Sequence, residues 1–572
     1  MNIRIVLAIA VVAILGLAVS VWVGIQPPQP PEHRIFVNGV VLSMDDESRV
    51  FEAISLRGSS IEKLGSNEEI RALQASGSVV TDLQGRTLLP GFIDAHGHFP
   101  GSGLSVVAAD VNSPPIGTVL TIADIQNRLG EKLVGRDAGK WLLGFGYDDT
   151  LLAENRHPTR EELDAVSTEH PVYINHVSGH MGVGNSLALA AMGIDADSED
   201  PVGGVIVRKP GSREPAGLLQ ETAHMPVMEH AMDLSMLEGV RVAQAASAEY
   251  VSLGVTTAQS GGVDGALAKG MLAMSRFNLI APRLVLFPFY HLLGEDLLDG
   301  TFDPVAQSTD KVLIGPVKIV GDGSIQGYTG YLSEPYFVPF KGDADYRGYP
   351  LIPRETLVEV VNKFHKAGFQ LAIHGNGDAS IDDILYAFEQ ALLETPSDDP
   401  RLIIIHAQMA REDQLQKMLE LGATPSFFSA HTYYWGDRHR DIFMGPERAA
   451  RMSPTRSSEN IGLRYSVHLD TPVVPMNPLQ LLWSTVNRVS TGGQVIGPAQ
   501  RVSAMNALRA MTIDAAWQIF QEDRIGSLEP GKLADIVILS GSPLIESGDV
   551  RELEVVETLV GGVTVYGGDG NL

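Results

Sequence analysis

The sequence predicts an α/β protein with a central (β/α)8 barrel and a β domain built from both ends of the chain. Three observations predict this fold. Apolar strand-like runs alternate with helical patterns between residues 89 and 511. Short β-branched strands occur before and after this part. Histidine, lysine and aspartate recur where the predicted strands end, which is where such barrels carry their chemistry.

The N-terminus is a predicted export segment. Residues 5–25 carry no charge and follow Arg4, which fits a membrane-spanning helix with a cytoplasmic N-terminus. A cleaved signal peptide, with a small-residue cleavage site at residues 18–20, is the alternative. We therefore expect residues 1–26 to be a signal anchor or signal peptide, followed by a Pro-rich linker at 27–33. The protein would then be anchored facing the periplasm or the extracellular side, or secreted.

The composition of the chain excludes several classes of partner and of catalytic site. The formal net charge of -27 argues against nucleic acid and against anionic membrane surfaces as partners. The chain has no cysteine, so disulfides, thiolate metal ligands and cysteine nucleophiles are excluded. A metal would have to be held by histidine, carboxylate or lysine side chains. The expected partner is a small-molecule substrate, and the sequence leaves a homodimer open.

The domain organisation follows from the texture of the sequence. Residues 34–88 and 512–572 contain short strands and tight turns, and we expect them to form one composite β-sandwich. The whole chain has 572 residues, and the segment 89–511 is long enough for a barrel with insertions. The most prominent insertion is expected at about 147–235, where Gly, Pro and charged residues are frequent.

The candidate barrel strands are short apolar runs. They are Leu88–Ala95, Trp141–Phe145, Gly254–Gln259, Leu284–Phe289, Val312–Val320, Phe369–Ile373, Arg401–Ile405, Ala423–Phe428 and Ser466–Leu469. The candidate helices are Glu238–Leu253, Arg354–Ala367, Ser380–Glu394 and Arg411–Leu421.

Chemistry-bearing side chains follow several of these strands. His96 and His98 are two residues apart, so in an extended chain both imidazoles leave on the same side, about 7 Å apart. Neutral imidazole suits zinc and related ions. Lys318 interrupts an apolar run, and three further strands end in His374, His406 and Asp470. Because the carboxyl ends of barrel strands share one face, these residues together predict a metal-hydrolase site.

Each of these residues also has a structural interpretation. The histidine pair could be a solvated loop, Lys318 could pair with Asp322, and Asp470 could cap the following turn. His180, inside the predicted insertion, could donate to a substrate carbonyl or cap a loop. Convergence of several strand ends on one barrel face favours the functional interpretation.

The sequence resembles the amidohydrolase superfamily, in its family three and its YtcJ-like group. The resemblance covers about residues 34–569. It is carried by Leu89-Pro-Gly-Phe-Ile-Asp-Ala-His-Gly-His98, Val177-Ser-Gly-His180 with Asn185-Ser, Val317-Lys-Ile-Val-Gly-Asp-Gly323, His374-Gly-Asn-Gly-Asp-Ala379, His406-Ala-Gln408, Leu469-Asp-Thr-Pro-Val473 and Ile525-Gly-Ser-Leu-Glu-Pro-Gly-Lys-Leu-Ala-Asp535. Two departures concern the surroundings of the ligands: Ile405 stands where Glu is frequent, and His468-Leu469 stands where Ser is common.

The resemblance implies a TIM-like barrel, a composite β-sandwich and a site for one or two divalent metals, usually zinc. His96 and His98 would hold one metal, and His374 and His406 the second. Lys318 would bridge them as a carbamate. Asp470 would be both ligand and general base, and it is grouped with His406 as catalytic. His180 and Asp322 are the candidate substrate-binding residues.

The expected function is therefore hydrolysis of a non-peptide, amide-like C–N bond by metal-activated water. Asp470 would take a proton from that water and pass it to the leaving nitrogen. A deaminase or a cyclic amidase acting on a heterocycle is the alternative among enzymes. A non-catalytic exported binding protein with the same fold is the alternative from another class.

Overall fold

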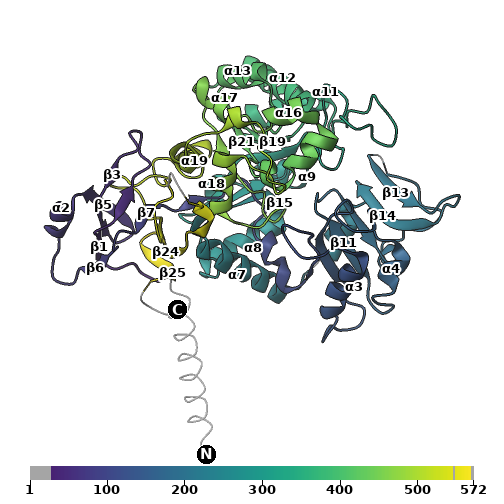
Figure 1. The fold of residues 1–572 in the computed structure, drawn as a ribbon, viewed down its shortest axis with the longest axis horizontal. Coiled ribbons are helices and arrows are strands. Elements are labelled where there is room, and N and C mark those ends of the chain that lie inside the picture. The colour runs from purple at the N-terminus through teal and green to yellow at the C-terminus, as the bar shows by residue number, and fades with distance from the viewer. Residues whose placement is uncertain (1–27, 202, 233, 545–547, 569–572) are drawn as a thin grey trace, which may run out of the picture.

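The structure is a computed structural model that describes residues 28–201, 203–232, 234–544 and 548–568. The predicted export segment, residues 1–26, lies outside these residues. Within the described part of the chain, no helix combines the length and the apolar character needed to cross a membrane. Figure 1 shows the strands in three groups, one near the chain termini, one central and one in a lobe at the right.

Strands from both ends of the chain share one sheet near the termini. The six-stranded sheet has the order β25-β24-β23-β7-β2-β3, and β7 pairs antiparallel with β23. Its strands are β2 (Val40–Leu42), β3 (Val50–Phe51), β7 (Thr87–Pro90), β23 (Ile536–Leu539), β24 (Val555–Val560) and β25 (Val563–Gly567). A second sheet, β5-β4-β1-β6, comprises β1 (His33–Val37), β4 (Ala53–Arg57), β5 (Ser60–Gly65) and β6 (Val79–Asp82), with helix α2 (Asn67–Arg71) beside it. Phe36, Ile54, Ile536 and Leu559 are buried in one shared core.

The predicted strand Leu88–Ala95 is wrong as a single strand. It divides into β7, which belongs to the terminal sheet, and β8 (Phe92–Ile93), which pairs parallel with β15 (Val255–Val263). The break lies at Gly91, where an added Cβ would come within 2.1 Å of the Thr256 side chain. One apolar run therefore serves two sheets, and the close approach at Gly91 allows the chain to pass from one to the other.

The central part contains two parallel sheets. The first has the order β17-β16-β15-β8 and the second β18-β19-β20-β21-β22, with every pairing parallel. The remaining strands are β16 (Arg283–Pro288), β17 (Val312–Ile314), β18 (Val317–Val320), β19 (Leu371–Gly375), β20 (Leu402–His406), β21 (Ala423–Phe427) and β22 (Ser466–Val467). Their side chains are buried on both faces, as expected for covered parallel strands.

Backbone contacts join the two parallel sheets at both of their junctions. Phe289, just after β16, forms a parallel bridge with Lys318 of β18. At the other junction Asp470 N donates to His96 O at 3.1 Å, and His98 N donates to Thr471 O at 2.7 Å. Strand pairing itself keeps the two sheets separate, so the closed barrel stays a prediction at this point.

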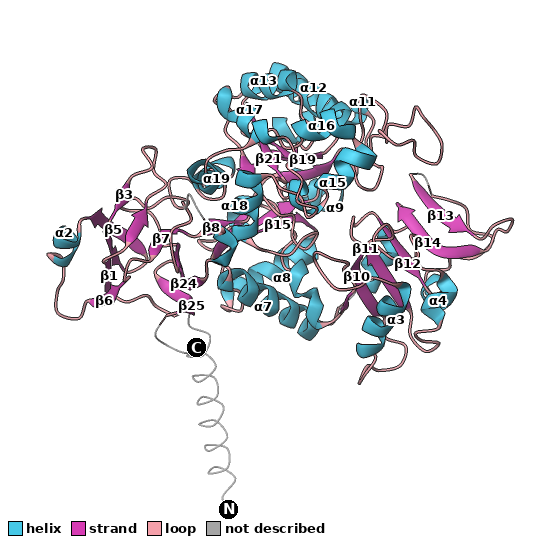
Figure 2. Ribbon diagram, in the orientation of Figure 1, coloured by secondary structure: helices cyan, strands magenta, loops and turns pink. Residues whose placement is uncertain are grey.

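The predicted helices agree with the structure to within about two residues, the usual spread of helix ends. They are α7 (Met236–Ser252), α11 (Arg354–Lys366), α12 (Asp378–Glu394) and α13 (Glu412–Leu421). In α11 the buried Leu357, Val361 and Phe364 follow the helical spacing that faces a core. Figure 2 shows such helices packed outside the central strands. The other central helices are α8 (Gly265–Arg276), α9 (Tyr290–Leu298), α10 (Pro304–Gln307), α14 (His431–Tyr434), α15 (Gly436–Arg438), α16 (Gly445–Arg451), α17 (Thr455–Asn460), α18 (Pro478–Asn487), α19 (Ala504–Ala510) and α20 (Ile513–Gln518).

The lobe at the right of Figure 1 is a six-stranded sheet of order β13-β14-β12-β11-β10-β9. It contains β9 (Ala109–Asp110), β10 (Leu142–Tyr147), β11 (Val172–His176), β12 (Met181–Gly184), β13 (Gly204–Arg208) and β14 (Pro215–Glu221), with helices α3 (Ile122–Glu131), α4 (Arg160–Asp164), α5 (Ser186–Ala191) and α6 (Met225–Ala231).

This lobe corrects two expectations. The run Trp141–Phe145, predicted as a barrel strand, overlaps β10 of the lobe sheet instead. The lobe sheet also begins at β9, well before the expected start of the insertion at residue 147. The physical reason is that a short buried apolar run looks the same in any parallel pair, and its partners are chosen by long-range packing.

One buried ion pair connects the terminal sheet to the parallel sheets. Arg283, at the start of β16, donates from Nε to Asp535 Oδ2 at 2.6 Å and from Nη2 to Oδ1 at 3.1 Å. The side chains are 11% and 4% exposed. Asp535 also accepts from Gly561 N at 2.7 Å. The pair therefore couples the two parts of the fold through a desolvated contact.

We expect Arg283→Met to reduce the free energy of unfolding by about 3–5 kcal/mol, because it leaves a buried carboxylate without its cation. Urea titration followed by circular dichroism measures this loss. Lys63→Met is the control, since Lys63 and Glu69 form an exposed pair and should contribute about 1 kcal/mol or less. Equal losses in the two variants would contradict a structural role for the buried pair.

Candidate metal centre

Five of the six predicted ligand residues lie at or just beyond the carboxyl ends of parallel strands, and the sixth, Lys318, lies within one. His96 and His98 follow β8, Lys318 lies in β18, His374 lies in β19, His406 ends β20 and Asp470 follows β22. The backbone contacts between residues 96–98 and 470–471 bring the first and the last of these strands together. The residues predicted at strand ends therefore lie along the carboxyl edge of the two parallel sheets.

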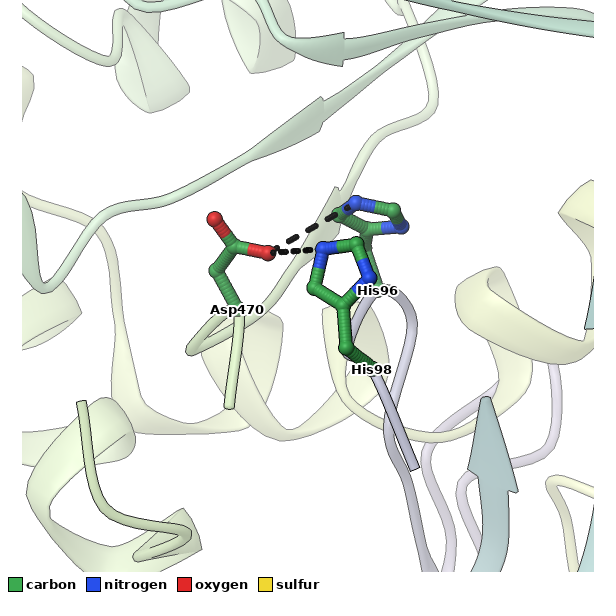
Figure 3. A group of neighbouring side chains, drawn as sticks. All are labelled: His96, His98 and Asp470. Carbon is green, nitrogen blue, oxygen red and sulfur yellow. Dashed lines mark ion pairs between the residues drawn. The ribbon is translucent and has the colours of Figure 1, made fainter. Parts of the chain in front are cut away.

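The tightest group consists of His96, His98 and Asp470 (Figure 3). Asp470 Oδ1 lies 3.6 Å from His96 Nε2 and 3.2 Å from His98 Nε2. The candidate ligand atoms of the three residues all lie within 4.8 Å of one another. Asp470 Oδ1 is buried without a hydrogen-bond partner of good geometry. A buried carboxylate oxygen left bare between two imidazole nitrogens fits a bound cation.

His406 and His374 extend this group. His406 Nε2 lies 3.9 Å from the other carboxylate oxygen, Asp470 Oδ2, and the rings of His374 and His406 are 4.5 Å apart edge to face. His406 and Asp470 both have left-handed backbone, with φ of 68° and 59°. Such φ values are strained for these residues, on the order of 1–3 kcal/mol each, and persist where the surroundings over-determine them.

Lys318 is buried beside the histidines. Its side chain is 2% exposed, and Nζ lies 3.3 Å from His96 Nε2. Burial lowers the pKa of Lys318 to about 7, against the opposing effect of the Asp470 carboxylate. The pairing of Lys318 with Asp322 that the structural interpretation required is wrong. The lysine faces His96, and the Asp322 oxygens are engaged elsewhere.

Asp322 braces the loop after β19. It is fully buried and accepts hydrogen bonds from the backbone N–H groups of Tyr331, Asn376 and Gly377 at 2.8–2.9 Å. Its Oδ1 also lies 3.2 Å from His374 Nδ1. These contacts orient His374 and the following loop, so the geometry favours a positioning role for Asp322 over the substrate contact that we predicted.

His180 reaches the site from the lobe. It lies between β11 and β12, and its Nδ1 is 3.0 Å from Glu221 Oε2 at the end of β14. Burial opposes the charged imidazolium, but Glu221 outweighs it, with smaller contributions from Asp322 and Asp470, and the pKa of His180 is raised. His180 therefore lies near enough to Asp322 and Asp470 to interact with their charges.

Two functional side chains were missed by sequence reasoning. Gln259 accepts at Oε1 from His96 Nδ1 at 2.7 Å and donates from Nε2 to Ala95 O at 2.6 Å. His468 lies 3.0 Å from His406, Nε2 to Nδ1. A signal existed for both, because Gln259 ends a predicted strand and His468 stands two residues before Asp470. His468 was noted only as a departure from the family pattern, and neither residue was predicted to act in the site.

The pKa shifts of His96, His406 and Asp470 favour the protonation states that bind a cation. Burial, followed by the positive charge of Lys318, lowers the pKa of His96 well below its usual value. Burial and then His374 do the same for His406. For Asp470 burial opposes ionisation, but the interactions with His98, followed by those with His468 and Lys318, outweigh burial and lower the pKa of Asp470. Neutral imidazoles around an ionised carboxylate are the protonation states that a metal requires.

A second group, Asp148, Asp149 and His176, also brings its polar atoms within 4.8 Å. Here Arg438 of α15 donates to Asp148 Oδ2 at 2.8 Å, and Asp149 Oδ1 lies 3.1 Å from His176 Nε2. The guanidinium already neutralises one carboxylate. We interpret this group as an ion-paired junction that holds the lobe, and with it His180, against α15.

Comparisons with known proteins agree with this geometry. The sequence model of the amidohydrolase family matches residues 79–566. The N-substituted formamide deformylase of Arthrobacter pascens is 28% identical over 540 residues, covering 93% of this chain and 98% of that protein. YtcJ of Bacillus subtilis is 26% identical over 555 residues, covering 93% and 99%. The crystal structure of an uncharacterized metal-dependent hydrolase from Pyrococcus horikoshii has a TM-score of 0.74 at 22% identity, covering 91% and 99%. This last likeness concerns the fold.

We expect Glu221→Gln to lower the pKa of His180, because the opposite charge at 3.0 Å is removed while burial remains. Histidine-selective NMR titration of the metal-free protein measures the change. Glu229→Gln, an exposed glutamate of the same lobe, should leave the pKa of His180 unchanged. An unaltered pKa in Glu221→Gln would show that Glu221 does not hold the imidazolium.

Proposed function

The chain belongs to the amidohydrolase family, and we propose that it hydrolyses a non-peptide, amide-like C–N bond of a small molecule with a divalent metal. The observation that carries the proposal is the bare, buried Asp470 Oδ1 between His96 and His98. The identity of the bond draws support from the formamide deformylase of Arthrobacter pascens, whose name states that it acts on N-substituted formamides.

The residues present fit a divalent metal. His96, His98 and Asp470 would hold one ion, and His374 with His406 would hold a second. Imidazole and carboxylate ligands without thiolates suit zinc, which we propose as the metal. When bound, such an ion lowers the pKa of water toward 7 and polarises a carbonyl group.

Lys318 is proposed to be carboxylated. Its neutral amine would add to carbon dioxide, forming a new N–C bond and releasing one proton, which gives a carbamate anion. Support comes from its burial, from its contact with His96 and from the lowered pKa, since only the neutral amine can react. The carbamate would convert a buried cation into an anionic ligand.

Asp470 is proposed to move the proton. Its Oδ2, which faces His406, would accept a proton from the attacking water and deliver it to the leaving nitrogen. His180, held as an imidazolium by Glu221, would donate a hydrogen bond to the substrate carbonyl oxygen from its Nε2. Negative charge develops on that oxygen during attack, so a charged donor there lowers the barrier.

We also infer that the two parallel sheets are halves of one closed (β/α)8 barrel. The Phe289–Lys318 bridge and the hydrogen bonds between residues 96–98 and 470–471 support closure. The fold likeness to the Pyrococcus horikoshii hydrolase gives further support. In a closed barrel the carboxyl ends of the strands, and therefore the candidate ligands that lie at them, would face one opening.

Asp470→Asn is expected to lower turnover by about 10²–10⁴-fold, because it preserves size but removes the general base. His96→Ala should lower turnover at least as much and should also lower the zinc content of the purified protein. The experiment compares turnover on a panel of N-formyl and N-acyl amines, metal content by mass spectrometry and melting temperature. Asp470→Asn should retain more metal than His96→Ala.

His33→Ala provides the control for this comparison, since His33 is buried in β1 of the terminal domain and contacts Ser55 and Ser78. It should retain both metal and turnover. Near-normal turnover in a folded Asp470→Asn protein, or wild-type protein that binds no divalent metal, would overturn the proposed mechanism.

Lys318→Ala is expected to abolish turnover, with partial rescue by acetate or propionate, which can occupy the space of the carbamate. In ¹³C-bicarbonate buffer the wild type should show a carbamate NMR signal that Lys318→Ala lacks. Because burial lowers the pKa of Lys318 to about 7, the signal should grow as the pH rises through about 7. Lys311→Ala is the control, a half-buried lysine bonded to Asn278. Full turnover in Lys318→Ala would refute a bridging role.

A further inference from the structure

A series of hydrogen-bonded, buried polar side chains, here called the relay, runs from His406 into the protein interior. It passes through His468, Ser426, Ser466, Gln518 and Thr424, each at most 3% exposed. The successive contacts are 3.0 Å for His406–His468, 2.9 Å for His468–Ser426, 2.8 Å for Ser426–Ser466, 2.5 Å for Ser466–Gln518 and 2.8 Å for Gln518–Thr424. A buried network of this kind is stable only when each donor meets an acceptor.

At the end of the relay farthest from His406, the donor and the acceptor of each hydrogen bond are defined. Gln518 Nε2 donates to the carbonyl of Pro425 at 2.9 Å and to Thr424 Oγ1. The Thr424 hydroxyl in turn donates to Arg464 O at 2.8 Å. Carbonyl oxygens only accept, so the amide of Gln518 cannot be reversed, and its Oε1 must accept.

The donor and acceptor roles at Gln518 fix those of each preceding hydrogen bond in turn. Ser466 has one hydroxyl proton and gives it to Gln518 Oε1, so it accepts from Ser426. Ser426 has then used its own proton and accepts from His468 Nδ1–H. The reverse order would leave two hydroxyl oxygens 2.8 Å apart with no proton between them. His468 Nε2 therefore carries the lone pair, and it accepts from His406 Nδ1–H.

We propose that His468, through this relay, sets the tautomer and the ring orientation of His406 as a metal-ligating side chain. With its proton on Nδ1, His406 presents the lone pair of Nε2, which faces Asp470 Oδ2. The inference rests on the proposed function for the identity of the ligand. It assigns His468 a positioning role, since His468 contacts His406 and neither substrate nor reacting atoms. A neighbouring group that fixes a ligating imidazole typically raises metal affinity.

The relay makes the arrangement at His406 parallel to that at His96. There the Gln259 amide, anchored by its bond to Ala95 O, accepts from His96 Nδ1 and leaves Nε2 toward Asp470. The two arrangements differ in the number of hydrogen bonds involved. His96 is fixed by one side chain, whereas the direction of the His406–His468 hydrogen bond depends on four further hydrogen bonds. A substitution remote from the centre should therefore change the tautomer of His406.

The test uses three variants of the full chain. His468→Leu removes the acceptor for His406 Nδ1–H. His468→Gln offers an amide that can accept from His406 and donate to Ser426. Ser466→Ala breaks the relay without touching either histidine. Ser429→Ala is the matched control, because Ser429 is an equally buried serine whose hydroxyl contacts Thr485 outside the relay.

Two measurements are made on each protein. Long-range ¹H–¹⁵N NMR of histidine-labelled, metal-free protein reads which nitrogen of His406 carries the proton, with His406→Asn supplying the assignment. Competition against a zinc-chelating dye gives the zinc dissociation constant. We expect the Nδ1–H tautomer in the wild type and a zinc constant raised about 10–100-fold in His468→Leu. His468→Gln should be affected less, Ser466→Ala should show a mixture of tautomers, and Ser429→Ala should be unchanged.

Several outcomes would overturn the inference. They are an Nε2–H tautomer at His406 in the wild type, or wild-type tautomer and zinc affinity in both His468→Leu and Ser466→Ala. If His468→Leu does not fold, Ser466→Ala and His468→Gln decide the question. A wild-type protein that binds no zinc or other divalent ion would instead refute the proposed function. The tautomer measurement on metal-free protein would still show whether His468 orders His406.

Discussion

The site depends on one constraint, the backbone contact between the ends of the first and last parallel strands. Asp470 N donates to His96 O, and His98 N donates to Thr471 O. These two hydrogen bonds place the Asp470 carboxylate against both imidazoles although the residues are far apart in sequence. They also hold Asp470 in a left-handed backbone conformation. Strain of this kind persists only where surrounding contacts outweigh it.

Around this junction, buried polar groups orient three of the histidines proposed as ligands through their second ring nitrogen. Gln259 holds His96, Asp322 faces His374, and His468 holds His406. The three orienting groups differ in chemistry: an amide, a carboxylate and an imidazole. They share burial, which makes an unpaired polar atom costly and so leaves one low-energy arrangement. Preorganisation of this centre therefore depends on residues that would never touch a substrate.

The lobe contributes the part of the site that the parallel sheets do not supply. His180 and its partner Glu221 come from the lobe sheet, and Arg438 of α15 ties the same lobe to the central part through Asp148. The position of His180 over the centre therefore depends on an ion-paired junction as well as on the local strand. Variation in such a lobe can change substrate choice without altering the metal ligands.

The sequence by itself determined the α/β class, the main helices and the six residues proposed as ligands. These follow from local patterns, namely apolar periodicity and polar residues at strand ends. The tertiary structure decided everything that requires knowing a strand's partner. It divided the predicted strand at Gly91 between two sheets, moved Trp141–Phe145 into the lobe and turned Lys318 toward His96 rather than Asp322. It also revealed the relay behind His406. The donor and acceptor in each hydrogen bond of that relay are fixed by groups distant in sequence, such as Gln518 and Pro425, that only folding brings together.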